Sequence, residues 1–558
     1  MSSRIAGLTL CALGLVCVAT LQANAQSFRV QCPTSTITHP DPTNSDLNST
    51  EPAYAGPTTY TSTNTGNPAI GYQVPSGNVN GAIKCQQISG GDGYATMGDG
   101  SQTYLFAFGP LSGLTDISNG LPGTEFPNVF NTVTTATLQA GDPATTGVVF
   151  NGAVGLVPDP NLADDPACSS TTPPAYCITT SPYYGLDGHV DPRPIMDVGV
   201  MNGNIPAPLM AIDEDDEYFL TLTNVGMIMR PDLFEQHTVH FHGYPNASAF
   251  YDGVPDASVA INIGGSFTYY YLAPDAGTYF FHCHITPPEH LQMGMVGQIY
   301  VRPRQNRVPP ALTLFQALQN QQNDLRTACN SSSDVLCTNP LPYAIVHGSD
   351  TSPKGGYDLS KTDPQTKKYA YNDGDGSTAY DVEYPLQIHG FDPNIHFVGM
   401  AFNPEGFADM KDKYFLLNGR SYPDTVTAGP LETMSADGQE HFAQPLPSII
   451  SITAGQKALL RISDLDVSEY QTLASLGIPM KVVGYNAKLL RDQAGNNMYY
   501  NTNSITLAGG ESTDVILDAS DTTKYSKGQV YYLYTPQLDH LANDAENFGG
   551  LMTEIHIL

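Results

Sequence analysis

Apolar and polar residues alternate in short runs along the middle of the chain, and each run ends in a turn within a few residues. A repeat of two residues predicts a β-strand with one buried face, because successive side chains of a strand point to opposite sides. Short strands at this spacing favour a small β-sandwich or barrel. We predict strands at residues 195–200, 218–224, 238–242, 266–272, 278–284 and 297–301.

A second strand-rich stretch covers the C-terminal part of the chain. Its clearest strands are expected at residues 448–453, 457–462, 481–484, 513–517 and 530–534. The pattern therefore predicts an all-β chain with two barrels.

The remaining segments differ from the barrels in composition. Residues 26–190 are rich in Thr, Asn, Ser, Pro and Gly, which indicates a loop-rich region with short strand-like runs such as 104–108. Residues 311–328 predict a helix. We expect a signal peptide (1–25), a loop-rich N-terminal region (26–190), a first barrel (191–304), a linker with a helix and a disulfide loop (305–340) and a second barrel (341–558).

The charge balance narrows the possible partners. Acidic residues outnumber basic ones by 54 to 23, which gives the 558-residue chain a formal net charge of −31. This argues against nucleic acid or an anionic membrane as the main partner, and it would attract cations such as Mn(II) or Fe(II). In the signal segment, Arg4 precedes an apolar stretch, and Ala23 and Ala25 mark a cleavage site. No later stretch is long enough to span a bilayer, so we expect a secreted, periplasmic or extracellular protein.

The cysteines indicate one unpaired thiol. Seven remain beyond residue 25, and an odd number in an exported protein leaves one without a disulfide partner. Proximity, with the last pair assigned by elimination, predicts the disulfides Cys168–Cys177, Cys329–Cys337 and Cys32–Cys85. Cys283 is then left over. It could be an ordinary buried thiol, but its neighbours favour another role.

Six of the fourteen histidines fall in two short clusters: His237, His240 and His242, then His282, His284 and His290. Alternate residues of a strand share a face, so His240 and His242 point one way, as do His282 and His284. Cys283 must point to the opposite side. One strand would thus offer a thiolate to one side and two imidazoles to the other, which suits two metal sites joined by a single backbone segment.

Ligand chemistry selects copper. Two histidines and a cysteine with a distant methionine form the trigonal site of blue copper proteins, whereas zinc prefers four near-equal tetrahedral ligands. His237 can face the barrel interior with Cys283, because it lies an odd number of residues from His240. His290 and Met295 follow Cys283 along the chain and complete the set. A merely solvated or structural histidine cluster is the alternative, and the lone cysteine and the methionine argue against it.

Five further motifs follow one another in a recognisable order: MNGNIPAP at 201–208, HFHG at 240–243, YDGVP at 251–255, GSFTY at 265–269 and GTYFFHCH at 277–284. With them, the segment 201–303 resembles a cupredoxin domain of the multicopper oxidases. The C-terminal stretch is similar to a more distant cupredoxin domain, through LNGRSYPD at 417–424 and LAGGESTDV at 507–515. The resemblance implies two Greek-key barrels of the cupredoxin type and copper as the cofactor.

The resemblance also implies a role for each ligand. His237, Cys283 and His290 would bind a type 1 copper, with Met295 as axial ligand and Met293 as the weaker alternative. A second copper centre would take His240, His242, His282 and His284. Electrons would leave Cys283 through the flanking His282 and His284.

The chain departs from the family in two respects. Five residues separate His284 from His290, where the family has three. A complete trinuclear oxygen-reducing centre takes four His-x-His pairs in the family, and this chain supplies two. Copper nitrite reductases, which are related, need fewer histidines.

Three functions remain open on this basis. The first is an exported oxidase that takes electrons from a phenol or a metal ion at the type 1 copper and reduces oxygen at the second site. The second keeps the architecture but reduces nitrite. The third is a non-enzymatic copper-binding or electron-relay protein. Copper content separates them: four coppers per chain favour the first, two the second and one the third.

The segment 531–540 resembles the end of a cupredoxin domain that has lost its own His-Cys-His. By this resemblance, His540 lies where nitrite reductases place the histidine lent to a neighbouring subunit. The outward histidines of the first barrel need a surface to face, and a homo-oligomer such as a trimer would supply one. A loop histidine beside Asp539 is the alternative.

Overall fold

A computed structural model shows the fold of the chain. It describes residues 30–39, short pieces between 51 and 75, 79–131, short pieces between 169 and 180, 203–227, 235–243, 248–273, 275–308, 368–373, 376–398, 406–434, 440–492 and 496–558. The predicted signal peptide, the predicted strand at 195–200 and the predicted helix at 311–328 lie outside these residues. No helix in the described part of the chain is long and apolar enough to cross a membrane.

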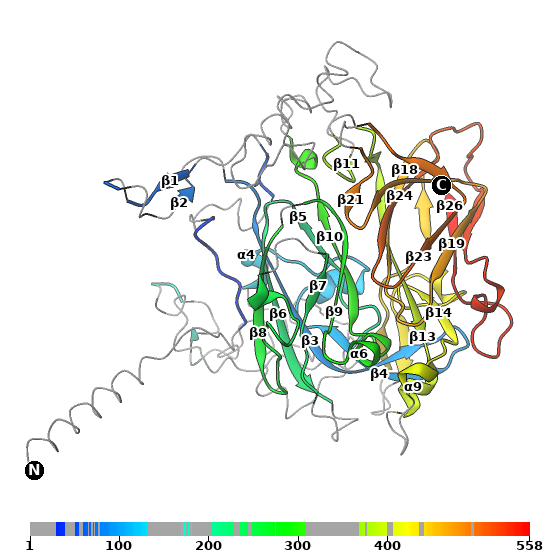
Figure 1. Ribbon diagram of the computed structural model, residues 1–558, viewed down its shortest axis with the longest axis horizontal. Helices are drawn as coiled ribbons and strands as arrows, with labels where there is room; N and C mark the ends of the chain where they lie inside the picture. The colour runs from blue at the N-terminus through cyan, green and yellow to red at the C-terminus, as the bar shows by residue number, and fades with distance from the viewer. Residues whose placement is uncertain are drawn as a thin grey trace, which may run out of the picture.

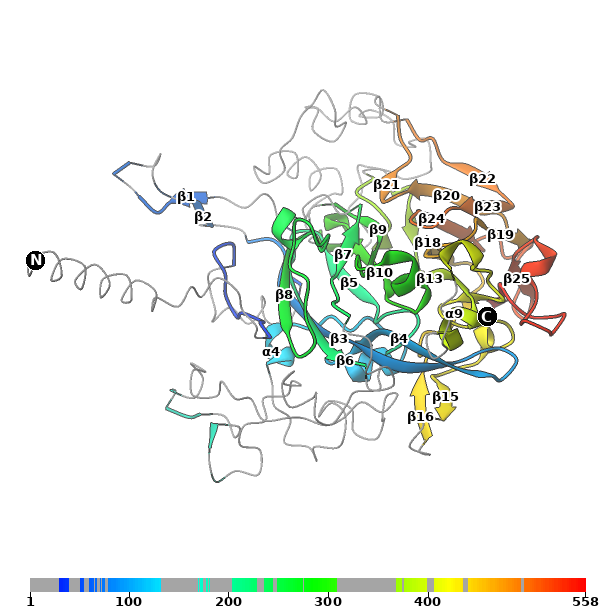
Figure 2. The same cartoon turned by 60° about the horizontal axis from the view of Figure 1, so that its bottom comes forward.

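The first barrel consists of two four-stranded sheets, shown mainly in green and blue in Figures 1 and 2. One has the order β5-β10-β9-β7 and the other β4-β3-β6-β8. The strands are β3 (Ile83–Thr96), β4 (Gln102–Pro110), β5 (Met210–Asp213), β6 (Glu217–Gly226), β7 (His240–His242), β8 (Ser266–Leu272), β9 (Gly277–His282) and β10 (Val296–Arg302). Alternate residues build the core, such as Phe267, Tyr269 and Tyr271 of β8.

The second barrel has one sheet of seven strands, in the order β14-β13-β18-β24-β20-β21 with β22 paired to β20, and one of five, in the order β17-β26-β25-β19-β23. The strands are β13 (Val382–Phe391), β14 (Tyr414–Leu417), β17 (Ile450–Ile452), β18 (Lys457–Asp464), β19 (Gln471–Leu476), β20 (Met480–Tyr485), β21 (Lys488–Leu489), β22 (Tyr500–Thr502), β23 (Ser504–Leu507), β24 (Ser512–Asp518), β25 (Val530–Tyr534) and β26 (Met552–Ile557). The prediction of an all-β fold with two cupredoxin-like barrels is confirmed.

Shorter elements complete the described chain. The helices are α3 (Leu114–Ser118), α4 (Pro127–Phe130), α6 (Pro287–Gln292) and α9 (Pro393–Val398), with 3-10 turns η5 (Ala249–Tyr251), η6 (Arg304–Arg307), η8 (Phe407–Asp409), η9 (Asp424–Val426) and η10 (Leu538–His540). Three small strand pairs join β1 (Tyr60–Ser62) to β2 (Gln73–Pro75), β11 (Lys368–Tyr369) to β12 (Ala379–Tyr380) and β15 (Leu431–Met434) to β16 (Glu440–Ala443).

The structure differs from the sequence analysis in the place of β3 and β4. Both lie in the region expected to be rich in loops, yet they form half of one sheet of the first barrel. β3 pairs in parallel with β6, so that Ile83 lies opposite Glu217. The far end of this hairpin packs on the second barrel, where Ala95 and Leu105 share a buried cluster with Leu416, and Figure 2 shows the hairpin crossing beneath both barrels.

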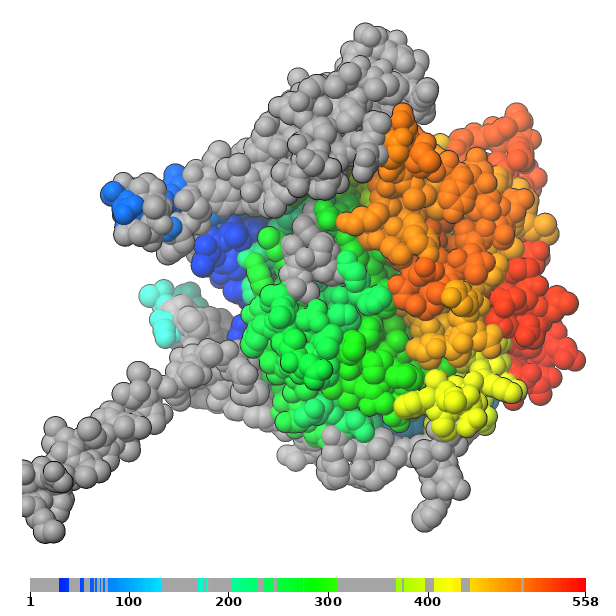
Figure 3. Space-filling view, in the orientation of Figure 1, coloured from blue at the N-terminus to red at the C-terminus, as the bar shows by residue number. Residues whose placement is uncertain are grey.

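The two barrels pack side by side, as Figure 3 shows in green and in yellow to red. The predicted disulfide Cys32–Cys85 is present and ties the N-terminal segment to β3. Cys177 is also disulfide-bonded, while Cys168, Cys329 and Cys337 lie outside the described residues. Cys283 is free and buried.

Candidate metal centre

Cys283 lies directly after β9, and its side chain belongs to the core of the first barrel. His237 comes from the segment before β7 and forms a backbone bridge to Ile261. The chain after Cys283 turns into the short helix α6, which begins with two prolines and brings His290 back toward the sulfur. The extra residues between His284 and His290 therefore still allow His290 to approach Cys283.

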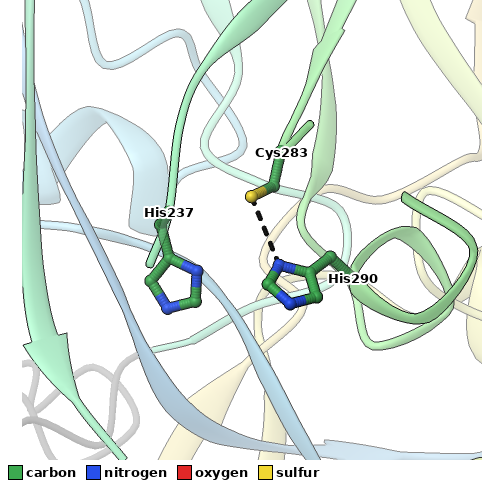
Figure 4. A group of neighbouring side chains, drawn as sticks. All are labelled: His237, Cys283 and His290. Atoms are coloured by element: carbon green, nitrogen blue, oxygen red, sulfur yellow. Dashed lines mark hydrogen bonds between the residues drawn. The ribbon is translucent and has the colours of Figure 1, made fainter. Parts of the chain in front are cut away.

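The three side chains converge on one buried space, as Figure 4 shows. Ligand atoms of His237, Cys283 and His290 all lie within 4.8 Å of one another. His290 Nδ1 is 3.2 Å from Cys283 Sγ. The backbone N–H of Thr238 donates to the same sulfur over 3.4 Å. Two imidazoles and a thiolate are the strong ligands of a type 1 copper site, and hydrogen bonds to the sulfur tune its redox potential.

The residues present fit a metal. Both ring nitrogens of His237 are buried without a hydrogen-bond partner, which a native protein rarely tolerates unless another group satisfies them. Burial, together with the charge of His290, holds the pKa of His237 well below its usual value, so the ring is in the neutral form that binds metals.

A hydrogen bond couples Cys283 to His290. Burial acts to raise the pKa of the Cys283 thiol, but the charge and hydrogen bond of His290 lower it overall. Burial acts in turn to lower the pKa of His290, but Cys283 and then Glu235 raise it to about 9. The contact with His290 thus favours the thiolate form of Cys283, which is the form that binds copper.

Met295 is fully buried beside the same space. Its Cε and the Cδ2 of His237 would lie 3.0 Å and 2.6 Å from a Cβ built on Gly90 of β3. The ring of Phe106 packs edge-on against His290, with centroids 5.1 Å apart, and covers the group from β4. Met293 is also buried in this core.

The other four histidines gather outside the barrel. β7 pairs with β9 so that His240 lies directly opposite His282. The ring of His240 lies 5.9 Å from His242, 5.3 Å from His282 and 5.1 Å from His284, measured between centroids. Their ring nitrogens are less tightly grouped than the ligand atoms of the first set. Among the described residues, no three of these four histidines bring nitrogens within 4.8 Å of one another.

Hydrogen bonds orient two of these rings. His240 Nδ1 donates to the carbonyl of Asp252 over 2.6 Å, and His282 Nδ1 donates to the carbonyl of Cys283 over 2.8 Å. Each bond fixes the tautomer and leaves Nε2 with a free lone pair, as in most metal-binding histidines. Burial lowers the pKa of His282 to about 3, so this ring is neutral as well.

A cleft of about 400 Å³ opens where these histidines meet the second barrel. His242 and His282 line one side, and Leu465–Tyr470 and Ala508–Gly510 line the other. A Cβ on Gly510 would lie 3.3 Å from His242 Cε1, so the two barrels nearly touch here. The second barrel of the same chain thus provides a surface that the outward histidines face.

His540 lies inside the second barrel, 1% exposed and stacked on Phe415 with ring centroids 3.8 Å apart. Its Nδ1 is 2.9 Å from Gln471 Oε1, and its Nε2 is 3.1 Å from Glu469 Oε2. Glu469 lines the cleft. Both ring nitrogens of His540 are thus engaged within its own barrel, so at least one of these contacts would have to break before the ring could bind a metal.

Sequence reasoning missed several residues around the two sets. Thr238 links them, since its N–H bonds to the cysteine sulfur and its Oγ1 accepts the N–H of His284 over 2.9 Å. Asp252 acts through its backbone, inside the YDGVP motif. A glycine within a strand often marks a close approach of other groups, but no strand was predicted around Gly90, so this signal could not be used.

The first barrel is similar in sequence to known proteins. Residues 188–306 match the model of a multicopper oxidase family. A laccase of Aspergillus fumigatus is 32% identical over 128 residues, which is 23% of this chain and 20% of that protein. A copper-containing nitrite reductase of Rhizobium meliloti is 35% identical over 109 residues, which is 19% of this chain and 26% of that protein. The chain thus matches about a fifth to a quarter of the length of these relatives.

The solved structures include a blue copper oxidase from Nitrosomonas europaea, with 20% identity and a TM-score of 0.39 over 64% of this chain and 78% of that one. This score is low, so the assignment of the fold rests on the strand order described above. The resemblance to multicopper oxidases is confirmed, since residues 188–306 match the model of a multicopper oxidase domain. The copper ligands predicted from the sequence, His540 excepted, lie within this domain, and members of the family bind copper.

Proposed function

We propose that this protein is an exported copper-dependent oxidoreductase of the multicopper oxidase type. One observation carries the proposal: Cys283 faces a buried pair of imidazoles, while His282 and His284 beside it face outward with His240 and His242. A single stretch of backbone therefore joins an electron-accepting site to a site that can bind a small oxidant. The donor would be a small molecule such as a phenol, or a metal ion drawn by the net charge of −31.

Copper in the first set would accept one electron at a time from the donor. His237, Cys283 and His290 would hold the copper in the barrel core, and the buried Met295 beside them would supply a weaker fourth ligand. Cys283 is bonded through the backbone to His282 and His284, and the carbonyl of Cys283 accepts the hydrogen bond from His282 Nδ1. Electrons would pass from the sulfur to the outward histidines over this short route of backbone bonds and one hydrogen bond.

At the second site, His240, His242, His282 and His284 would hold copper beside the cleft, and oxygen would be reduced there. His240 and His282 present Nε2 because their Nδ1 atoms are bonded to carbonyls.

Nitrite is the second candidate oxidant. The chain supplies two His-x-His pairs rather than four, and the matching segment is 35% identical to a copper-containing nitrite reductase. A trimer that lends His540 between subunits belongs with this alternative.

The test is copper content and consumption of oxidant by the full-length secreted protein. We expect intense thiolate-to-copper absorption in the wild type, its loss in Cys283→Ser, and retention of the colour in His284→Ala with loss of copper from the second site. Oxygen and nitrite uptake are then measured with phenols, Mn(II) and Fe(II) as donors. A wild type that stays colourless at full copper loading would refute the type 1 site, and a blue protein that turns over neither oxidant would leave an electron-relay role.

A further inference from the structure

The loop that carries Cys283, His290 and Met295, three of the four proposed type 1 ligands, lies against the second barrel. It runs from Cys283 to Met295 and includes α6, which contains His290. Two backbone hydrogen bonds close it: the N–H of Met295 donates to the carbonyl of His290 over 2.8 Å, and the N–H of Cys283 donates to the carbonyl of Met295 over 3.0 Å. A displacement of the end of α6 therefore moves His290 and Met295 together.

Gln292, the last residue of α6, is fully buried and uses both ends of its amide on the second barrel. Its Nε2 donates to Asp412 Oδ1 over 2.7 Å. Its Oε1 accepts the backbone N–H of Asp392 over 3.0 Å. The preceding carbonyl, that of Leu291, accepts a bond of 2.9 Å from His389 Nε2.

These partners are themselves well fixed. His389 is buried, and burial lowers its pKa, so the neutral ring donates from Nε2. Asp412 is held on its other oxygen by the hydroxyl of Ser468. Removing one partner of such a buried hydrogen bond is costly, because the polar group that remains is then buried without that bond.

We propose that Gln292 is a positioning residue for the type 1 copper, through which the second barrel holds His290 and Met295 in place. The inference rests on the type 1 site proposed above and adds a function for the second barrel. Partners outside the first ligand sphere commonly tune metal affinity and electronic structure. Here the support comes from a different domain, so the geometry of the copper site depends on how the two barrels dock.

The chain offers a matched control at the same interface. Gln298 of β10 is also fully buried, and its Nε2 donates to the carbonyl of Arg461 over 3.0 Å and to Ser463 Oγ over 2.9 Å. It contacts the second barrel from a strand instead of from the copper loop. A purely structural role for both glutamines predicts equal effects of Gln292→Ala and Gln298→Ala.

The experiment measures the thiolate-to-copper absorption, the midpoint potential, copper release to a chelator, and thermal unfolding of the full-length copper-loaded variants. We expect Gln292→Ala to shift the absorption and the potential and to release copper roughly ten-fold faster. Gln298→Ala should lower thermal stability and leave the absorption and the potential as in the wild type.

A second pair of variants keeps the test decisive if Gln292→Ala does not fold. Asp412→Asn retains a carbonyl oxygen for Gln292 and should keep the wild-type spectrum, whereas Asp412→Ala should reproduce the shift. A blue wild type whose spectrum and potential are unchanged in both Gln292→Ala and Asp412→Ala overturns the inference alone. A colourless wild type overturns the type 1 proposal, and this inference with it.

Discussion

Gly90 provides a direct test of the geometry around the predicted type 1 ligands. In Gly90→Ala the new Cβ would lie 2.6 Å from His237 Cδ2 and 3.0 Å from Met295 Cε. Carbon atoms in contact are separated by about 3.5 Å or more, so the imidazole has to move by roughly 1 Å. Crowding a packed core in this way costs about 1–3 kcal/mol of unfolding free energy. We therefore expect a folded but less stable protein with a displaced copper ligand.

The assay separates displacement of the ligand from loss of stability. Unfolding of the copper-free variant measures the loss of unfolding free energy. The thiolate-to-copper absorption of the copper-loaded variant measures whether His237 has been displaced. Gly123→Ala is the control, because its Cβ would lie 2.5 Å from Ile117 Cδ1, a clash of similar size away from the histidines. It should lose stability and keep the wild-type spectrum. If Gly90→Ala loses stability but keeps the wild-type spectrum and potential, His237 is not a copper ligand.

Three further predictions concern stability. Burial, followed by the charge of Asp466, raises the pKa of Asp412 from 3.8 to about 8. Between these two pH values the folded protein keeps a proton on Asp412 that the unfolded chain releases. The free energy of unfolding should therefore fall as pH rises from 3.8 to about 8, by at most about 1.4 kcal/mol per pH unit. Asp412→Asn should flatten that slope in chemical unfolding. Burial opposes the shift at Glu383, but two arginines lower its pKa from 4.5 to about 2. Its contribution should be complete above pH 4.5 and disappear toward pH 2, while Glu383→Gln should cost about 3–5 kcal/mol at neutral pH and lack that acid loss. The disulfide Cys32–Cys85 closes 53 residues, and replacing both cysteines by alanine should cost about 4 kcal/mol; an unchanged unfolding midpoint would contradict this.

Strands with strict alternation were predictable from the sequence, and their bounds agree to within a few residues. The prediction at 218–224 became β6 (Glu217–Gly226), and that at 530–534 became β25 (Val530–Tyr534). The reason is physical: each strand places every second residue in a core, so burial imposes the period of two.

The hairpin of β3 and β4 lies within residues 26–190, which were expected to be rich in loops because of their Thr, Asn, Ser, Pro and Gly content. Three glycines, at 90, 91 and 93, lie within β3. In the structure, only a residue without a side chain fits at such positions, because other groups approach closely, such as His237 at Gly90 and Gly203 at Gly93. From the sequence alone, where such neighbours are unknown, a run of glycines predicts a loop.

Convergence of the predicted type 1 ligands could be anticipated from the sequence, because strand parity fixes which residues share a face. The surface opposite the outward histidines could not, since it comes from loops of another barrel. Glu469 and Gly510 lie far along the chain and form no motif with the histidines. The contacts of His540 depend likewise on Gln471 and Glu469, which only the folded second barrel brings together.

The parallel pairing of β3 with β6 also sets an order of assembly. Ile83 of β3 can pair with Glu217 of β6 only after the more than one hundred residues between them have been synthesised. The sheet therefore closes late. Contacts between residues so distant in sequence slow folding, because the entropy of closing the loop is lost before the pairing is gained. Lengthening the segment between β4 and β5 adds little further cost, about 0.6 kcal/mol per doubling of the loop. The first barrel therefore tolerates large insertions at this point of its topology, while the route by which it folds remains long-range and slow.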